Sequence, residues 1–182
     1  GLNDIKAEIP IIEENFNSPL ENARKKAFTY YRSFHIPVFS CDSGLYIDDL
    51  PDTLQPGVHV RTINGVRLND DEMIAYDSDL SKSHGNKLVC RYKNAICLVF
   101  DEQTFFERMD SSIESEKFII TSISHSKRIN GFPLYSLSID IESGKYFYDI
   151  KDEESKKASK ISQGFVKFFV EFLNQINQKA IE

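Results

Sequence analysis

The chain has no tryptophan, three cysteines and four histidines among its 182 residues. Cys41, Cys90 and Cys97 are odd in number and lack C-x-x-C spacing, so the sequence indicates neither a disulfide framework nor a zinc cluster. The histidines form no H-x-x-H or H-E-x-x-H pattern. Sparse, unpaired cysteines are typical of a reducing compartment, and we therefore expect a cytoplasmic protein.

Long apolar runs are also missing. No stretch approaches the roughly eighteen residues that a membrane-spanning helix needs, and no secretory signal pattern is present, so we expect no membrane partner. Lysine and arginine number 22 against 28 aspartates and glutamates, which gives a net charge of −6. An acidic chain has no general attraction to a phosphate backbone, so a nucleic acid polymer is not the expected partner.

The remaining composition is that of a globular protein, with 41% hydrophobic and 27% charged residues. A chain of this length can fill one core or form two lobes that share a sheet. We therefore expect a single domain over 1–182. Residue 1 is glycine and the pattern of helices and strands starts abruptly, so we also expect that a natural N-terminal segment is missing.

Secondary-structure signals interleave helices and strands. Ser18-Pro19 opens a predicted helix over 19–33, with Glu21 as the acid of a capping box. A proline-containing turn leads to a short strand over 36–40. Further helices are predicted over 69–82 and 158–178, and strands over 87–100, 104–108, 117–123, 134–141 and 146–150. The alternation favours an α/β or α+β class with a mixed sheet.

Charged residues near the start predict a site for a metal ion and a nucleotide. Glu13 and Glu14 precede the first helix, Lys26 lies on it, and Asp42 begins an acidic turn. Carboxylates can hold magnesium, and a helix lysine can meet phosphate oxygens. Simpler roles stay open: solvated acids, a surface lysine and an ordinary turn aspartate. Cys41 is interpreted as a packed thiol, because no histidine is placed to activate it.

The order of these motifs resembles the house-cleaning nucleoside triphosphate pyrophosphatases, the inosine and xanthosine triphosphatase family. The matching motifs are Glu13-Glu14, Leu20-Glu21-Asn22-Ala23, Lys26-Ala27, Asp42-Ser43-Gly44-Leu45 and Pro56-Gly57-Val58. The resemblance implies an elongated mixed α/β fold with flanking helices, in which two lobes surround a central cleft, and usually a homodimer. It also implies magnesium-dependent hydrolysis of inosine and xanthosine triphosphates to monophosphate and pyrophosphate.

The resemblance assigns roles to matching positions. It implies Glu14 and Asp42 as metal ligands, with Asp42 and Lys26 as the catalytic pair. We expect Asp42 to orient or deprotonate the attacking water, and Lys26 to offset charge on the transferred group. The expected substrate contacts are Asn22, Ser43, Gly44, Arg61 and Gln163.

Several positions depart from the family pattern. Cys41 replaces the first of two acids, Pro133-Leu134-Tyr135 replaces Gly-Tyr-Asp, and Ser162-Gln163-Gly164 replaces Ser-His-Arg. The opening strand and phosphate-binding turn of the family have no counterpart before Gly1. Three hypotheses therefore stay open: an active enzyme of the family type, a pyrophosphatase with altered nucleotide selectivity, and a catalytically impaired nucleotide-binding or dimeric relative.

Overall fold

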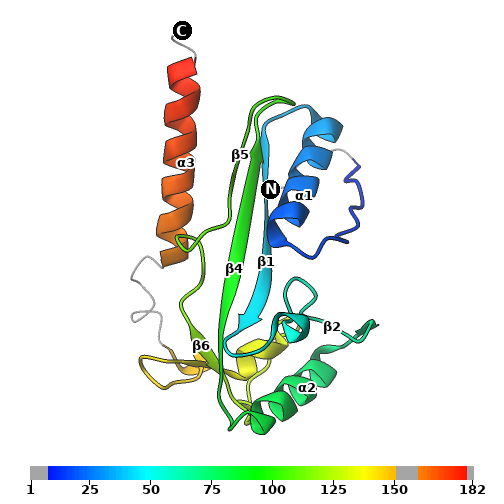
Figure 1. Cartoon of the computed structure of the whole chain (residues 1–182), viewed down its shortest axis with the longest axis vertical. Coiled ribbons are helices and arrows are strands. Elements are labelled where there is room, and N and C mark those ends of the chain that lie inside the picture. The colour runs from blue at the N-terminus through cyan, green and yellow to red at the C-terminus, as the bar shows by residue number, and fades with distance from the viewer. Residues whose placement is uncertain (1–7, 151–159, 180–182) are drawn as a thin grey trace.

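A computed structural model describes residues 8–150 and 160–179. An elongated sheet runs along the long axis of the molecule (Figure 1). Helix α1 (Pro19–Phe34) and helix α3 (Lys160–Lys179) lie on opposite sides of its upper half, and α2 (Asp70–Ser83) lies at its lower end. None of the described helices is both long and apolar enough to cross a membrane.

The sheet has the order β1-β4-β6-β7, with β5 paired to the upper part of β4. Its strands are β1 (Val38–Ile47), β4 (Leu88–Val99), β5 (Phe105–Arg108), β6 (Phe118–Ile120) and β7 (Ser138–Asp140). The strands β2 (Thr62–Ile63) and β3 (Val66–Arg67) form a separate hairpin. The predicted α/β class, with an elongated sheet and flanking helices, is confirmed, and every pairing among the described strands is antiparallel.

Strand β1 is longer than the sequence predicted. The expected strand over 36–40 and the acidic turn starting at Asp42 are one continuous strand, which pairs with β4 from Val38↔Val99 to Ile47↔Cys90. The prediction of a turn was wrong because Ser43-Gly44 is compatible with extended backbone when a long partner strand supplies every ladder hydrogen bond. Asp42 therefore projects from the middle of a strand.

In the upper lobe, successive residues of β4 are buried on opposite faces of the sheet. Ala95, Cys97 and Val99 pack with the α1 residues Ala23 and Ala27, and all five are fully buried. The intervening Ile96 and Leu98 pack with phenylalanines of α3. Successive strand residues point to opposite faces, so one strand carries the core of two helices.

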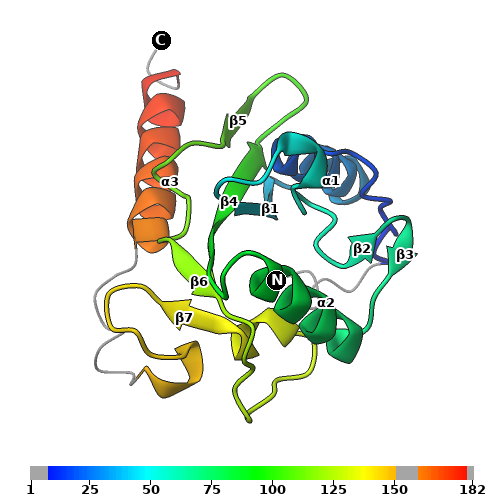
Figure 2. The same cartoon turned by 60° about the horizontal axis from the view of Figure 1, so that its bottom comes forward.

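The lower lobe has its own core around the other ends of β1 and β4. Leu45, Ile47, Leu88 and Cys90 pack there with Met73 of α2. The 3₁₀ segment η3 (Pro133–Ser136) lies beside α2 below the sheet (Figure 2). Two further 3₁₀ segments are η2 (Asp52–Leu54) and η4 (Phe147–Asp149). The two lobes share β1 and β4.

Helix ends differ from the sequence predictions. Ser18 is the N-cap of α1, but its side chain makes no capping hydrogen bond, so the predicted capping box with Glu21 is wrong. A capping box occurs instead at α2: the Glu72 backbone N–H donates to Asn69 (3.0 Å), and the Asn69 backbone N–H donates to Glu72 (2.7 Å). Asn69 fits the preference for asparagine at an N-cap.

Two connections between elements also differ from the sequence predictions. The Asn64-Gly65 turn of the β2–β3 hairpin has φ angles of 51° and 80°, and such a pair is the strongest short-range hairpin signal. The hairpin predicted from 134–141 and 146–150 is reduced to η3, the short β7 and a single bridge between Ile139 and Tyr146. Pro133 and the buried Leu134 favour the 3₁₀ turn over an extended strand.

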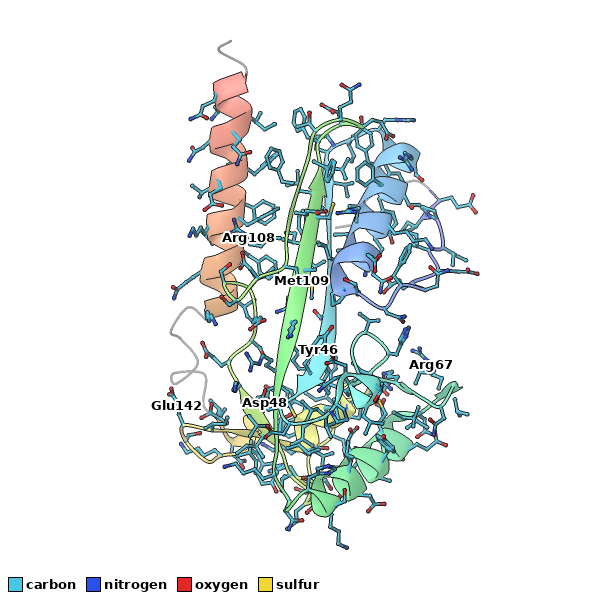
Figure 3. The ribbon with its side chains drawn as sticks, viewed as in Figure 1. Tyr46, Asp48, Arg67, Arg108, Met109 and Glu142 are labelled. Atoms are coloured by element: carbon cyan, nitrogen blue, oxygen red, sulfur yellow. The ribbon has the colours of Figure 1, made fainter. Side chains whose placement is uncertain are left out.

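Helix α3 packs on the sheet through aromatic rings and one partly buried cation. Phe169 contacts Phe39 of β1, with ring centroids 5.2 Å apart. Arg108 of β5 lies between the sheet and α3 (Figure 3), where its guanidinium pairs with Glu171 and stands 5.4 Å from the Phe168 ring centroid. A Cβ atom on Gly164 would lie 2.0 Å from the Ser112 carbonyl oxygen, so only glycine permits this approach. Residues 158 and 159 of the predicted helix lie outside the described part.

Asp77 is a carboxyl group in the lower core. It is 5% exposed on the same face of α2 as Met73 and Ser81, and no hydrogen bond to it is found among the described residues. Burial raises the pKa of its carboxyl from 3.8 to about 7. The folded protein therefore keeps a proton that the unfolded chain releases between these two values.

This proton predicts a pH dependence of stability. As the pH rises from about 4 to about 7, the contribution of Asp77 should lower the free energy of unfolding by up to about 4 kcal/mol, with no further change above pH 7. Asp77→Asn should remove this slope, so the variant should gain stability relative to wild type between pH 5 and pH 8. Urea unfolding at several pH values measures the difference. Asp79→Asn, at an exposed position of α2, is the control; equal slopes for wild type and Asp77→Asn would contradict the prediction.

Candidate functional site

Lys26 joins the two carboxylates that the sequence singled out. Its ammonium lies 2.8 Å from Asp42 Oδ1 on β1 and 3.2 Å from Glu14 Oε1 in the segment before α1. The Lys26 and Asp42 side chains are 14% and 11% exposed, whereas Glu14 is 45% exposed. A helix, a strand and the lead-in segment thus bring Glu14, Lys26 and Asp42 together, as the sequence predicted.

Asn22 completes this cluster one turn before Lys26. Its Nδ2 donates to Asp42 Oδ2 (3.2 Å) and to the carbonyl oxygen of Phe16 (3.3 Å), while its Oδ1 accepts from the Phe16 backbone N–H (3.3 Å). Asn22 is 1% exposed. It therefore ties the segment that carries Glu14 to the helix and to Asp42, and it orients the second oxygen of that carboxylate.

The charge state of Lys26 follows from its neighbours. Burial by itself would lower the pKa of the ammonium, but the hydrogen bond from Lys26 to Asp42 and the charges of Asp42 and Glu14 outweigh it, so the pKa is raised. Lys26 therefore remains a cation at neutral pH. A fixed cation of this kind can hold a polyphosphate oxygen.

Ser43 and Gly44 have structural contacts of their own. The Ser43 hydroxyl donates to Asn94 Oδ1 on β4 (2.6 Å). A Cβ on Gly44 would lie 2.9 Å from the Gly57 carbonyl carbon, so glycine allows the 55–58 segment to pair with the edge of β1. The expected phosphate approach at Gly44 is taken by protein backbone.

Cys41 projects from the sheet face opposite to Asp42. Directly paired residues share a face, and Cys41 pairs with Ile96 on the α3 side while Asp42 pairs with Ala95 on the α1 side. An acid at position 41 would thus point away from the Lys26 ammonium. Cys41 is exposed, so its interpretation as a packed thiol is wrong. Partial desolvation still raises the pKa of its thiol more than the Lys26 charge lowers it.

A cavity of about 510 Å³ lies next to this cluster, and we call it the polar cavity. Glu14 contributes to its wall together with His59, Arg61 and Arg67. Arg67 lies on the β2–β3 hairpin (Figure 3) and forms no ion pair with any residue in the described ranges. Three potentially cationic side chains beside one carboxylate suit an anionic ligand.

A second cavity of about 500 Å³ lies between the lobes, and we call it the aromatic cavity. Its wall includes the four rings of Tyr92, Phe132, Tyr135 and Phe147. Both cavities include Val60 and Arg61, so they adjoin along the segment that follows Gly57. The lobes therefore enclose a cleft with a polar end near Glu14 and an aromatic end against η3.

Arg61 is held by the protein at this junction. Its Nη1 donates to Asp70 Oδ1 (2.7 Å) and its Nη2 to the Gly131 carbonyl (2.9 Å). The second Asp70 oxygen accepts from the Gly131 backbone N–H (2.7 Å). Arg61 lines the cleft as predicted, but two of its nitrogens position the 129–135 loop.

Gln163 lies on α3, where its side chain is exposed. It is absent from the described walls of both cavities, whereas Ile161, half a turn earlier, reaches the aromatic cavity. Of the sequence-predicted residues, the structure thus brings Glu14, Asn22, Lys26 and Asp42 into one cluster. Glu14, Ser43 and Arg61 line the cleft, whereas the described walls of the two cavities include none of Asn22, Lys26, Asp42, Gly44 and Gln163.

A profile of the Ham1 family matches residues 1–131, which is most of the chain. The chain belongs to the Ham1 family. This confirms the resemblance from which the site residues were predicted. A dITP/XTP pyrophosphatase from Hydrogenobaculum sp. is 36% identical over 78 residues, which cover 42% of this chain and 37% of that protein.

Solved structures of Ham1 proteins share the fold. The Coxiella burnetii HAM1 protein aligns with a TM-score of 0.67 and 19% identity over 98% of this chain and 89% of its own. A nucleoside-triphosphatase / dITP/XTP pyrophosphatase from Mycobacterium abscessus aligns with a TM-score of 0.66 and 20% identity, over 91% and 81%. The Staphylococcus aureus Ham1 protein gives 0.64 and 17%, over 88% and 80%.

Sequence reasoning did not predict some residues of this site. Arg67 belongs to a hairpin that the Asn64-Gly65 pair signals, although the strands are only two residues long. Asp70 looks like one acid among several at a helix start. The aromatic wall comes from β4, η3 and η4, which are distant in sequence, so no local pattern could have indicated it.

The Lys26 contacts predict a stability cost for its removal. Lys26→Ala leaves the mostly buried Asp42 carboxylate with Asn22 as its hydrogen-bond donor among the described residues. We expect the free energy of unfolding to fall by about 1–3 kcal/mol, measured by urea denaturation at pH 7. Lys25→Ala, which removes exposed hydrogen bonds from the same helix, is the matched control. Equal stability of both variants would show that the Lys26–Asp42 pair contributes nothing to folding.

Proposed function

We propose that this Ham1 protein is a magnesium-dependent nucleoside triphosphate pyrophosphatase. It hydrolyses non-standard purine nucleotides of the inosine and xanthosine type to monophosphate and pyrophosphate. The observation that carries the proposal is the convergence of Glu14, Lys26 and Asp42 beside a cleft with a polar and an aromatic end. The pyrophosphatase name of the Hydrogenobaculum relative supports the same reaction.

Asp42 is the general base for the attacking water molecule. One of its oxygens is held by Lys26 and the other by Asn22, so its position is fixed before substrate arrives. The carboxylate takes a proton from water as the water oxygen bonds to phosphorus. The anhydride bond between the first two phosphates then breaks, and the bridging oxygen leaves with pyrophosphate. General-base assistance of this kind typically contributes 10²–10⁴-fold to the rate.

Lys26 supplies fixed positive charge to this reaction. Its ammonium bridges two carboxylates in the protein alone, and a phosphate oxygen can replace its contact with the more exposed Glu14. The charge that develops on the transferred group is then offset in a partly buried site, where electrostatic interactions are stronger than in water.

The residues present fit magnesium. Within residues 8–150 and 160–179, no three His, Cys, Asp or Glu side chains are grouped for a metal. Magnesium usually takes only one or two carboxylates and completes its shell with waters and phosphate oxygens. Glu14 and Asp42 would hold it, and when bound it supplies electrophilic charge to the phosphates.

The cleft sets the direction of the nucleotide. The polyphosphate lies along the polar cavity, where Arg61 and Arg67 face it, and the base lies in the aromatic cavity. Because the two cavities adjoin at Val60 and Arg61, one extended ligand can occupy both. Their volumes are within the range of small-molecule sites.

The catalytic role is tested at Asp42. We expect wild-type protein to release pyrophosphate from inosine and xanthosine triphosphates in the presence of magnesium, and Asp42→Asn to lower kcat by at least about 100-fold. Asp52→Asn, on the exposed η2 segment, should behave as wild type. Turnover of no nucleotide above the Asp42→Asn level would reject the enzymatic function.

A catalytically impaired relative is the second candidate. The observation that favours it is the ion pair itself, because Lys26 is paired with both carboxylates that a metal would need. In that case nucleotide and magnesium would raise Tm without turnover. A pyrophosphatase with altered base selectivity is the third candidate, since Gln163 lies outside the described cavity walls.

We also propose that the protein is a cytoplasmic homodimer. Val166, Val170 and Leu173 form an exposed apolar stripe on α3, at 63%, 50% and 56% exposure, which is surface available for association. Sedimentation equilibrium should give twice the 20.9 kDa chain mass. A monomer at micromolar concentration would contradict the dimer.

A further inference from the structure

The β2–β3 hairpin carries an arginine whose charge has no partner in the described part of the protein. Arg67 makes neither an ion pair nor a side-chain hydrogen bond with any residue of 8–150 or 160–179, and it contributes to the wall of the polar cavity. An arginine with a structural role on this surface pairs with a carboxylate instead, as Arg24 does with Glu107. The guanidinium of Arg67 is therefore free to bind a ligand.

The register of the hairpin directs Arg67 into the polar cavity. Thr62 and Arg67 are paired directly, so their side chains share one face of the hairpin, and Thr62 also lines the cavity. Ile63 and Val66 form the next pair and occupy the opposite face, where Val66 is 62% exposed. Figure 3 shows Arg67 on this hairpin, which forms a small sheet of its own.

His59 is a second fixed donor in the same wall. Its backbone N–H donates to the Pro56 carbonyl (3.0 Å), and its own carbonyl accepts from the Thr62 N–H (2.8 Å). Its Nε2 lies 3.0 Å from Asn17 Oδ1, and no hydrogen bond to its Nδ1 is found among the described residues. A protonated imidazole donates from both nitrogens, so Nδ1 can then donate to an anion.

The charges of the described wall favour an anion, although the whole chain has a net charge of −6. Glu14 is the only carboxylate in this part of the wall, and the Lys26 ammonium lies 3.2 Å from it. Of the two arginines, Arg61 already donates to Asp70. Arg67 is thus the arginine of the polar cavity that the protein leaves for a ligand.

The position of the catalytic cluster decides which phosphate groups reach this cavity. Lys26 and Asp42 lie outside its described wall, whereas Glu14 belongs both to the cluster and to the wall. In the proposed reaction the first phosphate is attacked beside Asp42. The phosphates further along the chain, which leave as pyrophosphate, then extend past Glu14 into the polar cavity.

We propose that Arg67 is a specificity-determining residue that binds the terminal phosphate of the nucleotide, with His59 beside it. The inference rests on the proposed function and adds the residue that distinguishes a triphosphate from shorter nucleotides. The planar guanidinium has parallel N–H donors that match two oxygens of a phosphate group, and this geometry favours a phosphate over a spherical anion.

The binding test uses inorganic pyrophosphate, which binds without turnover. In calorimetry with magnesium present, Arg67→Gln should weaken pyrophosphate binding by about 10-fold or more, as expected for the loss of a charged hydrogen-bonding partner. Inosine monophosphate should bind wild type and variant equally, because its single phosphate lies outside the polar cavity. Arg67→Lys should recover part of the loss, since it keeps the charge without the paired donors. Lys87→Gln, an equal change of charge at an exposed position outside the cavity wall, should bind as wild type.

The kinetic test compares nucleotides of different length. Arg67→Gln should raise KM for inosine triphosphate about 10-fold and leave kcat within about twofold, because the terminal phosphate is held equally in the ground state and in the transition state. Its KM for inosine diphosphate should not change, so the preference for the triphosphate should fall by the same factor.

Equal affinity of wild type and Arg67→Gln for pyrophosphate, or no binding of pyrophosphate to wild type, would overturn the proposal. An equal loss of inosine monophosphate binding would also overturn it, because the effect would then not depend on the terminal phosphate. Failure of the proposed function looks different: pyrophosphate binding would still depend on Arg67, while no triphosphate is hydrolysed.

Discussion

The Lys26 ammonium, held between Glu14 and Asp42, is the interaction on which the candidate site depends. It joins the segment before α1 to the helix and to β1, in addition to the packing of α1 on the sheet. Asn22 repeats the connection with neutral hydrogen bonds to Phe16 and Asp42. The cluster therefore contributes to folding and prepares a carboxylate for chemistry, and substitutions in it affect both properties.

The long β1–β4 ladder decides how the site is divided between two sheet faces. Asp42 faces α1 with Asn22 and Lys26, whereas its neighbours Cys41 and Ser43 face the other side, where Ser43 borders the aromatic cavity. A nucleotide that uses both parts must pass the edge of β1, where the segment after Gly57 contributes Val60 and Arg61 to both cavities. The Gly44–Gly57 approach keeps that segment against the strand. Backbone packing at two glycines thereby positions a binding cleft.

Sequence reasoning succeeded where the signal was local. The apolar periodicity of α1 and α3 and the apolar run of β4 gave bounds within a few residues. Glu14, Lys26 and Asp42 were predicted from motif order and are brought together in space. Sequence reasoning failed where a residue has a partner far away in the chain. The turn predicted at Asp42 is a strand because β4 pairs with it, and Arg61 is bound by Asp70 and Gly131. Spacing along the chain carries no information on such partners.

By itself, the sequence determined the order of the three helices and of the long strand β4, the family and the residue types of the cluster, because helical and strand periodicity and motif spacing are properties of neighbouring residues. The tertiary structure alone decided which sheet face each side chain occupies and which rings form the aromatic cavity. Tyr92, Phe132 and Phe147 are not neighbours in the sequence, and only the β4–β6 register and the packing of η3 and η4 beside it bring them to one wall. A one-residue change of register would exchange the two faces of a strand, and this is why the pairing decides the site.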